Sequence, residues 1–221
     1  MKNDKPILVA GATGYVGGRL IPALLDAGYR VRAMGRSVEK LACRPWGQHP
    51  KVERVKGDVL DVESLKKALS GCGAAYYLVH SMIAQKHKFV EADRKAAENM
   101  VSAAESVGID RIIYLGGLSE KKDGRLRKHF PSRIEVADVL QSGRLPVTDL
   151  RAPMILGSGS ASFEILRYLV ERLPVMVTPR WVKSLNQPIA IRNVIQYLVG
   201  CLEHDETVGQ TYDIGGPDVV R

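Results

Sequence analysis

Short apolar stretches alternate with longer amphipathic stretches along most of this chain. The apolar stretches have the length of strands and are rich in Ile, Leu, Val and Tyr, which is typical of strands buried on both faces. The predicted strands are Pro6–Ala10, Arg30–Met34, Val52–Lys56, Ala74–Val79, Arg111–Leu115 and Val147–Leu150. The predicted helices between them are Gly14–Ala27, Val62–Ser70, Lys86–Val107 and Ser132–Ser142. This alternation predicts an α/β fold with a doubly wound parallel sheet.

The pattern becomes looser in the last third of the chain. Helices are predicted there at Ser160–Arg172 and Ile191–Glu203, with a proline-punctuated stretch, Pro174–Pro188, between them. A short strand is predicted at Gln210–Ile214. No repeat or low-complexity linker separates this part from the rest. We therefore interpret residues 1–221 as a single domain in which 151–221 form a small C-terminal lobe over the carboxyl ends of the strands.

A glycine-rich segment lies between the first predicted strand and the first predicted helix. Its sequence is Gly11-Ala12-Thr13-Gly14-Tyr15-Val16-Gly17. Glycines at this spacing allow a sharp turn, a close approach to a pyrophosphate and tight packing of the helix, whose N-terminus attracts phosphates. An ordinary tight turn with a helix cap is the alternative. The place between strand and helix favours a dinucleotide-binding (Rossmann) fold, in which the predicted cofactor-binding residues are Gly11, Thr13, Gly14, Tyr15, Val16 and Gly17.

The end of the second strand bears on which dinucleotide is bound. An acidic residue there usually selects NAD by binding the ribose 2′-hydroxyl. This chain has Arg36 and Ser37 instead. A guanidinium can pair with a 2′-phosphate, with the serine hydroxyl as a second donor, so NADP(H) is favoured over NAD(H). Arg32 on the same strand is a weaker candidate, and the alternative for Arg36 is a solvated loop residue.

Asp58 and Val59 follow the third predicted strand. A carboxylate there can accept from the adenine amino group while the next backbone N–H binds a ring nitrogen. An aspartate after a strand is also common in turns. We keep both readings of Asp58 and include Asp58 and Val59 among the cofactor-binding residues.

Composition narrows the class of partner. The chain has 32 Lys and Arg against 24 Asp and Glu, a formal charge of +8, which favours anionic partners. Aromatic residues make up only 6%, and no nucleic-acid-binding module is recognisable, so no nucleic-acid role is expected. No apolar stretch approaches the ~18 residues of a membrane span. Three widely spaced cysteines predict reduced thiols in a cytoplasmic protein, and no metal-binding spacing is present.

With the glycine segment, Arg36 and Asp58 in this order, the chain resembles an atypical or extended short-chain dehydrogenase/reductase, close to the NAD-dependent epimerase/dehydratase-like group. Four further segments match the pattern, at Tyr77–Ser81, Arg111–Leu118, Leu150–Gly157 and Gln187–Val194. The resemblance implies that Val79, His80 and Ser81 lie along the cofactor. It also implies a homodimer through two long helices, and a substrate lobe that continues beyond Arg221.

The catalytic pattern departs from that family. Classical members use a Tyr-x-x-x-Lys pair on the helix after the fifth strand and a serine at that strand's end. Here the corresponding positions hold His129 and Arg133, and the serine position falls within 116–118. His129 and Arg133 keep the i, i+4 spacing of one helix face, and a histidine can act as a general acid near neutral pH. The alternative is that both are surface residues next to the basic run Lys121–Lys128.

The resemblance implies an NADP(H)-binding oxidoreductase that passes hydride between nicotinamide and a small carbonyl or related electrophile. His129, Arg133 and His80 are the catalytic candidates. The alternative function is a non-catalytic dinucleotide-binding protein, a redox sensor or accessory subunit, because family members without the tyrosine include both kinds.

Overall fold

The computed structural model describes residues 4–79, 86–118, 121–122, 125–126, 131–172 and 185–220, with backbone only for 86–89, 121–122, 125–126, 131–132 and 161–162. Its centre is a seven-stranded sheet in the order β11-β8-β5-β4-β1-β2-β3. All neighbouring strands of this sheet pair in parallel. The strands are β1 Ile7–Ala10, β2 Val31–Gly35, β3 Val52–Lys56, β4 Ala74–Tyr77, β5 Arg111–Gly117, β8 Val147–Ala152 and β11 Thr211–Asp213.

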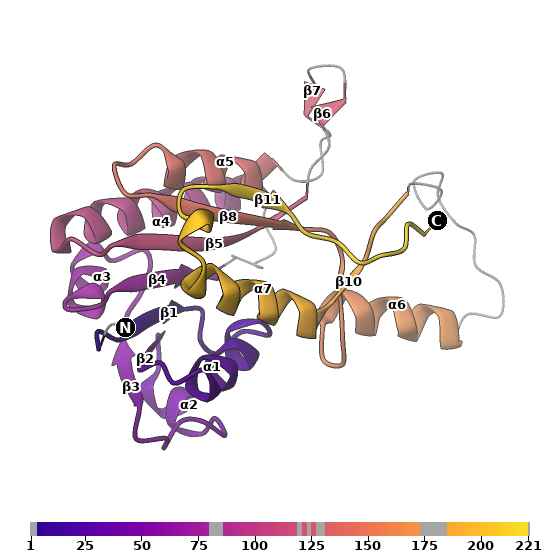
Figure 1. The fold of residues 1–221 in the computed structure, drawn as a ribbon. Coiled ribbons are helices and arrows are strands. Elements are labelled where there is room, and N and C mark those ends of the chain that lie inside the picture. The colour runs from indigo at the N-terminus through magenta and orange to yellow at the C-terminus, as the bar shows by residue number, and fades with distance from the viewer. Residues whose placement is uncertain are drawn as a thin grey trace.

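Helices cover both faces of this sheet (Figure 1). One face carries α1 Gly17–Asp26 and α7 Ile191–Glu203, which contact each other, with the short α2 Val38–Ala42 beside β2. The other face carries α3 Val62–Leu69, α4 Lys86–Val107 and α5 Pro131–Gln141. The predicted doubly wound α/β (Rossmann) fold is therefore confirmed. The chain reverses its order between β1 and β4, which is where such sheets bind ligands at their carboxyl edge.

The C-terminal third contributes to the main sheet as well as to a projection. β11 pairs with β8, and α7 packs beneath the sheet on α1. Figure 1 shows α6, Ala161–Arg172, extending away from this body. A two-stranded parallel pair, β9 Ile155–Leu156 with β10 Ile189–Ala190, lies at its base, and a separate hairpin joins β6 Lys121–Lys122 to β7 Arg125–Leu126. The substrate role of 151–221 stays a prediction.

Most predicted elements agree with the observed ones apart from their ends. α1 begins at Gly17 rather than Gly14, because Gly14 closes a turn by donating its N–H to the carbonyl of Gly11 at 2.9 Å. β5 and β8 continue to Gly117 and Ala152, because their mutual pairing extends past the last apolar residue. The pattern gave no signal for α2, a helix of only five residues.

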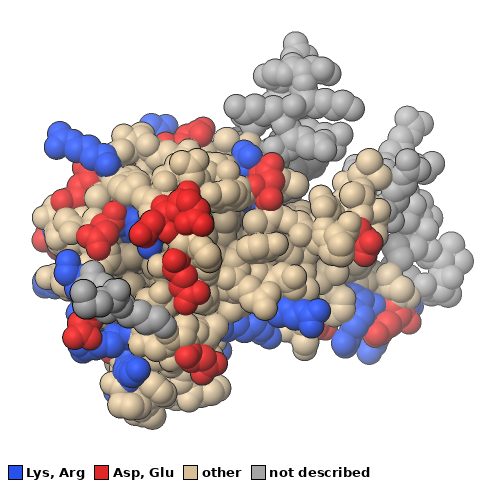
Figure 2. Space-filling view, viewed as in Figure 1, with Lys and Arg blue, Asp and Glu red and all other residues tan. Residues whose placement is uncertain are grey.

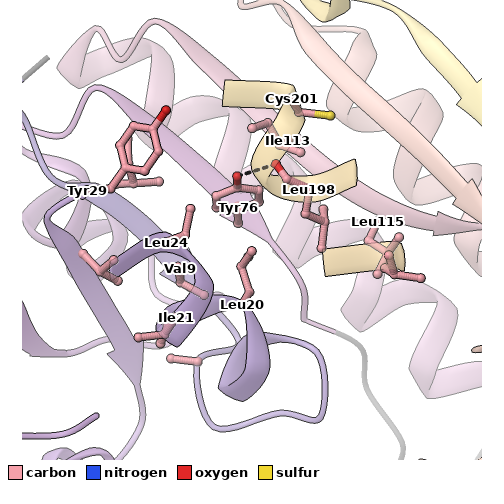
Figure 3. Packing of buried hydrophobic residues seen from close by; sticks show 14 of the residues in the cluster. Val9, Leu20, Ile21, Leu24, Tyr29, Tyr76, Ile113, Leu115, Leu198 and Cys201 are labelled. Atoms are coloured by element: carbon pink, nitrogen blue, oxygen red, sulfur yellow. Dashed lines mark hydrogen bonds between the residues drawn. The ribbon is translucent and has the colours of Figure 1, made fainter. Parts of the chain in front are cut away.

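Two apolar layers separate the helices from the sheet. The layer beneath α1 and α7 contains fully buried Val9, Leu20 and Leu198 (Figure 3). The layer beneath α3, α4 and α5 contains fully buried Leu8, Leu65 and Met100 among others. The alternation of side chains along each strand assigns neighbouring residues to opposite layers, as Leu8 and Val9 show. β1 and β4 are therefore buried on both faces, as the sequence predicted, whereas β3, which the sequence placed among the apolar strands, is half-buried to exposed because it lies at the edge of the sheet.

One hydroxyl ties the sheet to α7. Tyr76 on β4 is fully buried and donates its hydroxyl to the carbonyl of Leu198 at 2.7 Å (Figure 3). We expect Tyr76→Phe to lower the free energy of unfolding by about 1 kcal/mol, because the variant loses one buried hydrogen bond without changing the ring. Urea unfolding measures this, with Tyr197→Phe, a change at an exposed tyrosine of α7, as the control. Equal stability of the two variants would contradict the prediction.

Candidate functional site

The glycine loop lies at the carboxyl end of β1, at the reversal point of the sheet. Gly11 has a φ of +92°, a conformation that side-chain-bearing residues rarely adopt, and a Cβ there would lie 2.7 Å from the carbonyl oxygen of Leu78. A Cβ on Gly17 would clash with the carbonyl oxygen of Gly11. The loop therefore needs glycine at both ends. Gly11 is needed for the backbone angle, and Gly17 for the close packing of α1 against the loop.

The side chains of Tyr15 and Val16 in the loop pack against other parts of the fold. Val16 packs against the buried layer under α1. The guanidinium carbon of Arg19 lies 4.1 Å from the centre of the Tyr15 ring. The hydroxyl of Tyr15 is buried against Gly157. Arg19 also donates to the carbonyl of Ser158 at 2.7 Å. These contacts tie the loop to the segment before α6, so the side chains of Tyr15 and Arg19 have contacts within the fold, and phosphate binding by the backbone of 13–16 stays a prediction.

Arg36 and Ser37 lie directly after β2. Arg36 is exposed and has no hydrogen bond or ion pair with the described residues. The hydroxyl of Ser37 caps α2 by accepting from the backbone N–H of Lys40, and it donates to Glu39 at 2.7 Å. That hydrogen bond is the main cause of a lowered pKa of Glu39. Arg36 is thus available to a ligand. Ser37 could donate to a ligand only by giving up its hydrogen bond to Glu39.

Arg32, the weaker candidate for the 2′-phosphate, is used within the fold. Its guanidinium pairs with Glu53 on β3 at 2.7 Å and donates to the carbonyls of Ala68 and Ser70 at 2.8 and 2.6 Å. These bonds hold the C-terminal end of α3 against the sheet. Arg32 is therefore engaged in the fold through Nε and Nη1, which makes it the weaker candidate for the 2′-phosphate, as expected from the sequence.

Arg44 is a cation near the loop that the sequence analysis missed. It follows α2 and donates to the carbonyl of Thr13 at 2.5 Å. The neighbouring Trp46 is buried and donates its indole N–H to the carbonyl of Gly18 at 3.2 Å. The segment 44–46 therefore lies against the loop although it is distant in sequence. No local pattern could have indicated this, because the contact depends on how β2 and α2 pack on α1.

Asp58 and Val59 lie at the carboxyl end of β3. Oδ1 of Asp58 accepts from the backbone N–H of Leu60 at 3.0 Å, which is the turn contact that the alternative reading expected. Val59 packs on the second layer, and its carbonyl accepts from the buried amide of Asn99 at 3.0 Å. Oδ2 of Asp58 has no hydrogen bond with the described residues, so adenine recognition by this carboxylate stays a prediction.

The catalytic candidates are only partly within the described residues. His80, Ser81 and His129 lie outside them, and Val79 is the last described residue after β4. Arg133, in the first turn of α5, is described, and a Cβ on Gly117 would lie 2.8 Å from its Cδ. The arginine side chain therefore lies across the carboxyl end of β5, at the place where the resemblance expects a serine.

A crevice of about 300 Å³ lies beneath α5, and it was not predicted. Its lining includes Gly116, Gly117, Arg133, Asp138, Asp149 and Arg151. Asp149 on β8 is only 2% exposed, and its Oδ1 has no hydrogen-bond partner among the described residues. Burial raises the pKa of this carboxyl to about 6, against the lowering effect of Arg151 and with smaller raising effects of Asp213 and Asp138. An acidic residue inside a buried apolar strand was the signal that could have indicated it.

The raised pKa of Asp149 gives a pH dependence of stability. Because its folded-state pKa of about 6 exceeds the ordinary 3.8, the native state holds the proton more tightly, and stability falls as pH rises from about 4 to 6. We expect Asp149→Asn to raise the free energy of unfolding at pH 8 by about 1–3 kcal/mol, since the buried charge is removed. Urea unfolding at pH 8 and pH 5 measures this, with exposed Asp138→Asn as the control. Destabilisation at pH 8 would contradict the prediction.

The remaining chemical features of the described part of the chain concern metal binding, membrane insertion, surface charge and thiols. Among those residues no group of His, Cys, Asp and Glu could hold a metal ion. None of the helices within the described ranges has the length and apolar character needed to cross a bilayer. Figure 2 shows basic and acidic side chains interspersed on the face in view. Cys43, Cys72 and Cys201 are all free thiols.

Curated relatives match parts of this chain. A chloroplastic divinyl chlorophyllide a 8-vinyl-reductase of Arabidopsis thaliana is 22% identical, over 97% of this chain and 54% of its own length. A photosystem II assembly factor of Cyanophora paradoxa is 31% identical, over 52% of this chain and 35% of its own length. The chain thus spans about a third to a half of the length of these relatives.

Solved structures share the fold at low sequence identity. A nucleoside-diphosphate-sugar epimerase from Staphylococcus aureus has a TM-score of 0.78 and 20% identity, over 97% of this chain and 72% of that one. A dTDP-glucose 4,6-dehydratase from Streptomyces venezuelae, solved with NAD bound, has a TM-score of 0.79 and 17% identity, over 97% of this chain and 76% of that one. The sequence pattern of the NmrA-like family matches residues 3–166, which is most of the sheet and its helices. On that match and this fold, the chain belongs to the NmrA-like family, among relatives of the extended short-chain dehydrogenase/reductase type.

Proposed function

We propose that this protein is an NADP(H)-dependent oxidoreductase that transfers hydride between nicotinamide and a small carbonyl or related electrophile. The observation that carries the proposal is the glycine loop at the carboxyl end of β1, beside the reversal point of the sheet. The names of several relatives support it, since they include a vinyl reductase, a cinnamoyl-CoA reductase and a hydroxysteroid dehydrogenase. Among the solved structures that share the fold, a UDP-glucuronic acid 4-epimerase from Bacillus cereus is in complex with NAD, which supports a nicotinamide dinucleotide as cofactor.

The preference for NADP(H) rests on positive charge at the end of β2. Arg36 is exposed and has no partner among the described residues, and Arg44 lies against the loop through Thr13. A 2′-phosphate adds negative charge and acceptor oxygens that a guanidinium recognises well. Glu39 is the acidic residue nearest to Arg36 in the sequence. The hydrogen bond from Ser37 holds the Glu39 side chain at the first turn of α2.

The residues near the proposed reaction site have separate tasks. The bound dinucleotide supplies or accepts the hydride. Arg133 lies across Gly117, where its positive charge would stabilise negative charge developing on a substrate oxygen. His129 is our proton donor, and His80 our second candidate, because the free imidazole pKa of about 6.5 suits proton transfer near neutral pH. The cytoplasmic location and a homodimer through the long helices remain parts of the proposal.

A non-catalytic dinucleotide-binding role is the second candidate. The relative from Cyanophora paradoxa is named an assembly factor and not an enzyme. The positions of the classical Tyr, Lys and Ser also hold other residues in this chain. In this role the protein would report the state of its cofactor to a partner.

A dinucleotide titration followed by a substrate panel tests the proposal. We expect calorimetry to show NADPH binding at least tenfold more tightly than NADH, because only NADPH presents a 2′-phosphate to Arg36. NADPH oxidation is then followed at 340 nm with aldehydes, ketones, quinones and flavins. Binding without consumption of any of them would contradict the enzyme and favour the second candidate, whereas no binding would contradict both. Turnover unchanged in both His129→Ala and His80→Ala would exclude these proton donors.

A further inference from the structure

The crevice beneath α5 contains a buried acid that forms no ion pair with the described residues. Asp149 is 2% exposed, and its Oδ1 lacks any hydrogen-bond donor among the described residues. Buried carboxylates are normally paired or hydrogen-bonded, because an unpaired one loses its hydration without replacement. Val147 and Leu150 of the same strand are apolar and buried. An acid at this position therefore lowers stability, and a binding role explains its presence.

Small residues form part of the crevice lining. Gly116 lies on the adjacent strand, and a Cβ there would be 2.9 Å from Oδ1 of Asp149. The α5 side of the crevice is formed in part by Ala137, another small residue. Nε2 of Gln141 donates to the hydroxyl oxygen of Thr211 at 3.2 Å beside it. A cavity of about 300 Å³ that has Asp149 in its lining is suited to one small polar group.

The charges around the crevice favour a cationic ligand over an anionic one. Arg151 donates its Nε to Asp213 at 2.6 Å, so this cation has its own partner. Arg133 lies along Gly117, at the strand end. Asp138 of α5 adds a second carboxylate to the lining near Asp149. The lining of the crevice therefore presents two carboxylates, Asp149 and Asp138, and the part near Gly117 presents a positive charge.

We propose that this crevice binds the cationic, hydrogen-bond-donating nitrogen group of a small molecule, such as a guanidinium or a primary ammonium, with Asp149 as the acceptor. Such a group supplies the N–H donor and the positive charge that the carboxylate lacks. The crevice opens beside Gly117 and Arg133, where we place hydride transfer. The ligand would accordingly be a substrate with this nitrogen at one end and its reducible group toward Arg133. That last identification rests on the proposed function, whereas the binding site does not.

Proton linkage provides a specific signature of such a site. The groups that face Asp149 are Tyr114 on β5, Arg133 and Asp138 on α5, Arg151 on β8 and Asp213 on β11. A cation binds only the ionised carboxylate, so its affinity should fall about tenfold for each pH unit below the pKa of Asp149, about 6. Conversely, bound cation should lower that pKa.

Binding of methylguanidinium, followed by NMR on the isotopically labelled protein, tests the site, with methylurea as a neutral probe of the same shape. We expect methylguanidinium to bind at least tenfold more tightly than methylurea at pH 8, and the difference to be lost at pH 5. Asp149→Asn should remove this preference, while Asp110→Asn, the same change at an exposed aspartate before β5 and outside the lining, should alter affinity less than threefold. The ¹³Cγ titration of Asp149 should shift to lower pH with methylguanidinium present.

Three results would overturn the site: no detectable binding of methylguanidinium at 100 mM, equal binding of methylurea, or binding unaffected by Asp149→Asn. Tighter binding of acetate than of methylguanidinium would overturn it as well, since the arginines would then define an anion site. NADPH oxidation with carbonyl compounds that carry or lack an amino group separates this from the proposed function. Probe binding without any turnover contradicts only the proposed function, and turnover without probe binding contradicts only the crevice site.

Discussion

Gly17→Ala is expected to weaken NADPH binding at least thirtyfold and to lower the free energy of unfolding by about 1–3 kcal/mol. The added methyl group would meet the carbonyl oxygen of Gly11, which is backbone and cannot rotate away as a side chain can. To relieve the clash, α1 must move away from the loop, and the N-terminal N–H groups of the helix move with it. These groups are the ones that the loop would offer to the pyrophosphate. Calorimetric titration with NADPH and urea unfolding measure the two effects.

Gly18→Ala is the matched control for this change. It adds the same methyl group one residue later, where the nearest atom is the carbonyl oxygen of Ala12 at an ordinary 3.7 Å. Alanine also favours helix over glycine by about 1 kcal/mol, so this variant should be at least as stable as the parent. Its NADPH affinity should stay within threefold. If Gly17→Ala binds NADPH as tightly as Gly18→Ala does, the loop is not the phosphate site.

Arg36→Ala is expected to weaken NADPH binding by about 30- to 100-fold while changing NADH binding less than threefold, which corresponds to about 2–3 kcal/mol for a charge-assisted contact. The reason is that Arg36 is exposed at the end of β2 and has no partner among the described residues, so its loss disturbs no contact of the fold described here. Parallel titrations with NADPH and NADH give the ratio directly. Equal losses for the two dinucleotides would contradict the 2′-phosphate assignment.

Arg44→Ala shows whether a second cation shares this task. Arg44 holds the carbonyl of Thr13, so its removal should weaken NADPH and NADH alike, by about three- to tenfold if it acts through the loop. A selective loss of NADPH would instead show that Arg44 also contacts the 2′-phosphate. Lys40→Ala, an exposed cation of α2, is the control for simple loss of charge and should change neither affinity by more than twofold.

The fold could be predicted largely because burial is written into the sequence at short range. A strand such as Ile7–Ala10 is buried on both faces and is therefore apolar throughout, and this pattern needs no knowledge of its neighbours. The glycine loop could be recognised for a related reason, since its backbone angle and close packing both exclude side chains. α2 could not be predicted, because five residues with a single buried leucine carry no measurable period.

The site was predicted less completely than the fold, because charged residues look alike in sequence. Arg32 and Arg36 lie four residues apart, yet the structure gives Arg32 to Glu53 and the end of α3 and leaves Arg36 exposed. Asp149 looked like one polar position in a predicted strand. Only its burial beneath α5, beside Gly116, makes it an acceptor without a donor in the described chain.

The sequence by itself thus determined the doubly wound α/β architecture and the place of the loop, since both depend on local periodicity and on glycine. The tertiary structure decided which charges have partners, that Arg44 lies on the loop, and that a crevice encloses Asp149. The physical reason is that the preference for burial is a property of each residue type. Whether a charged side chain has a partner depends instead on which residues lie next to it. Those neighbours come from strands and helices distant in sequence, and their meeting is set by the order of the sheet.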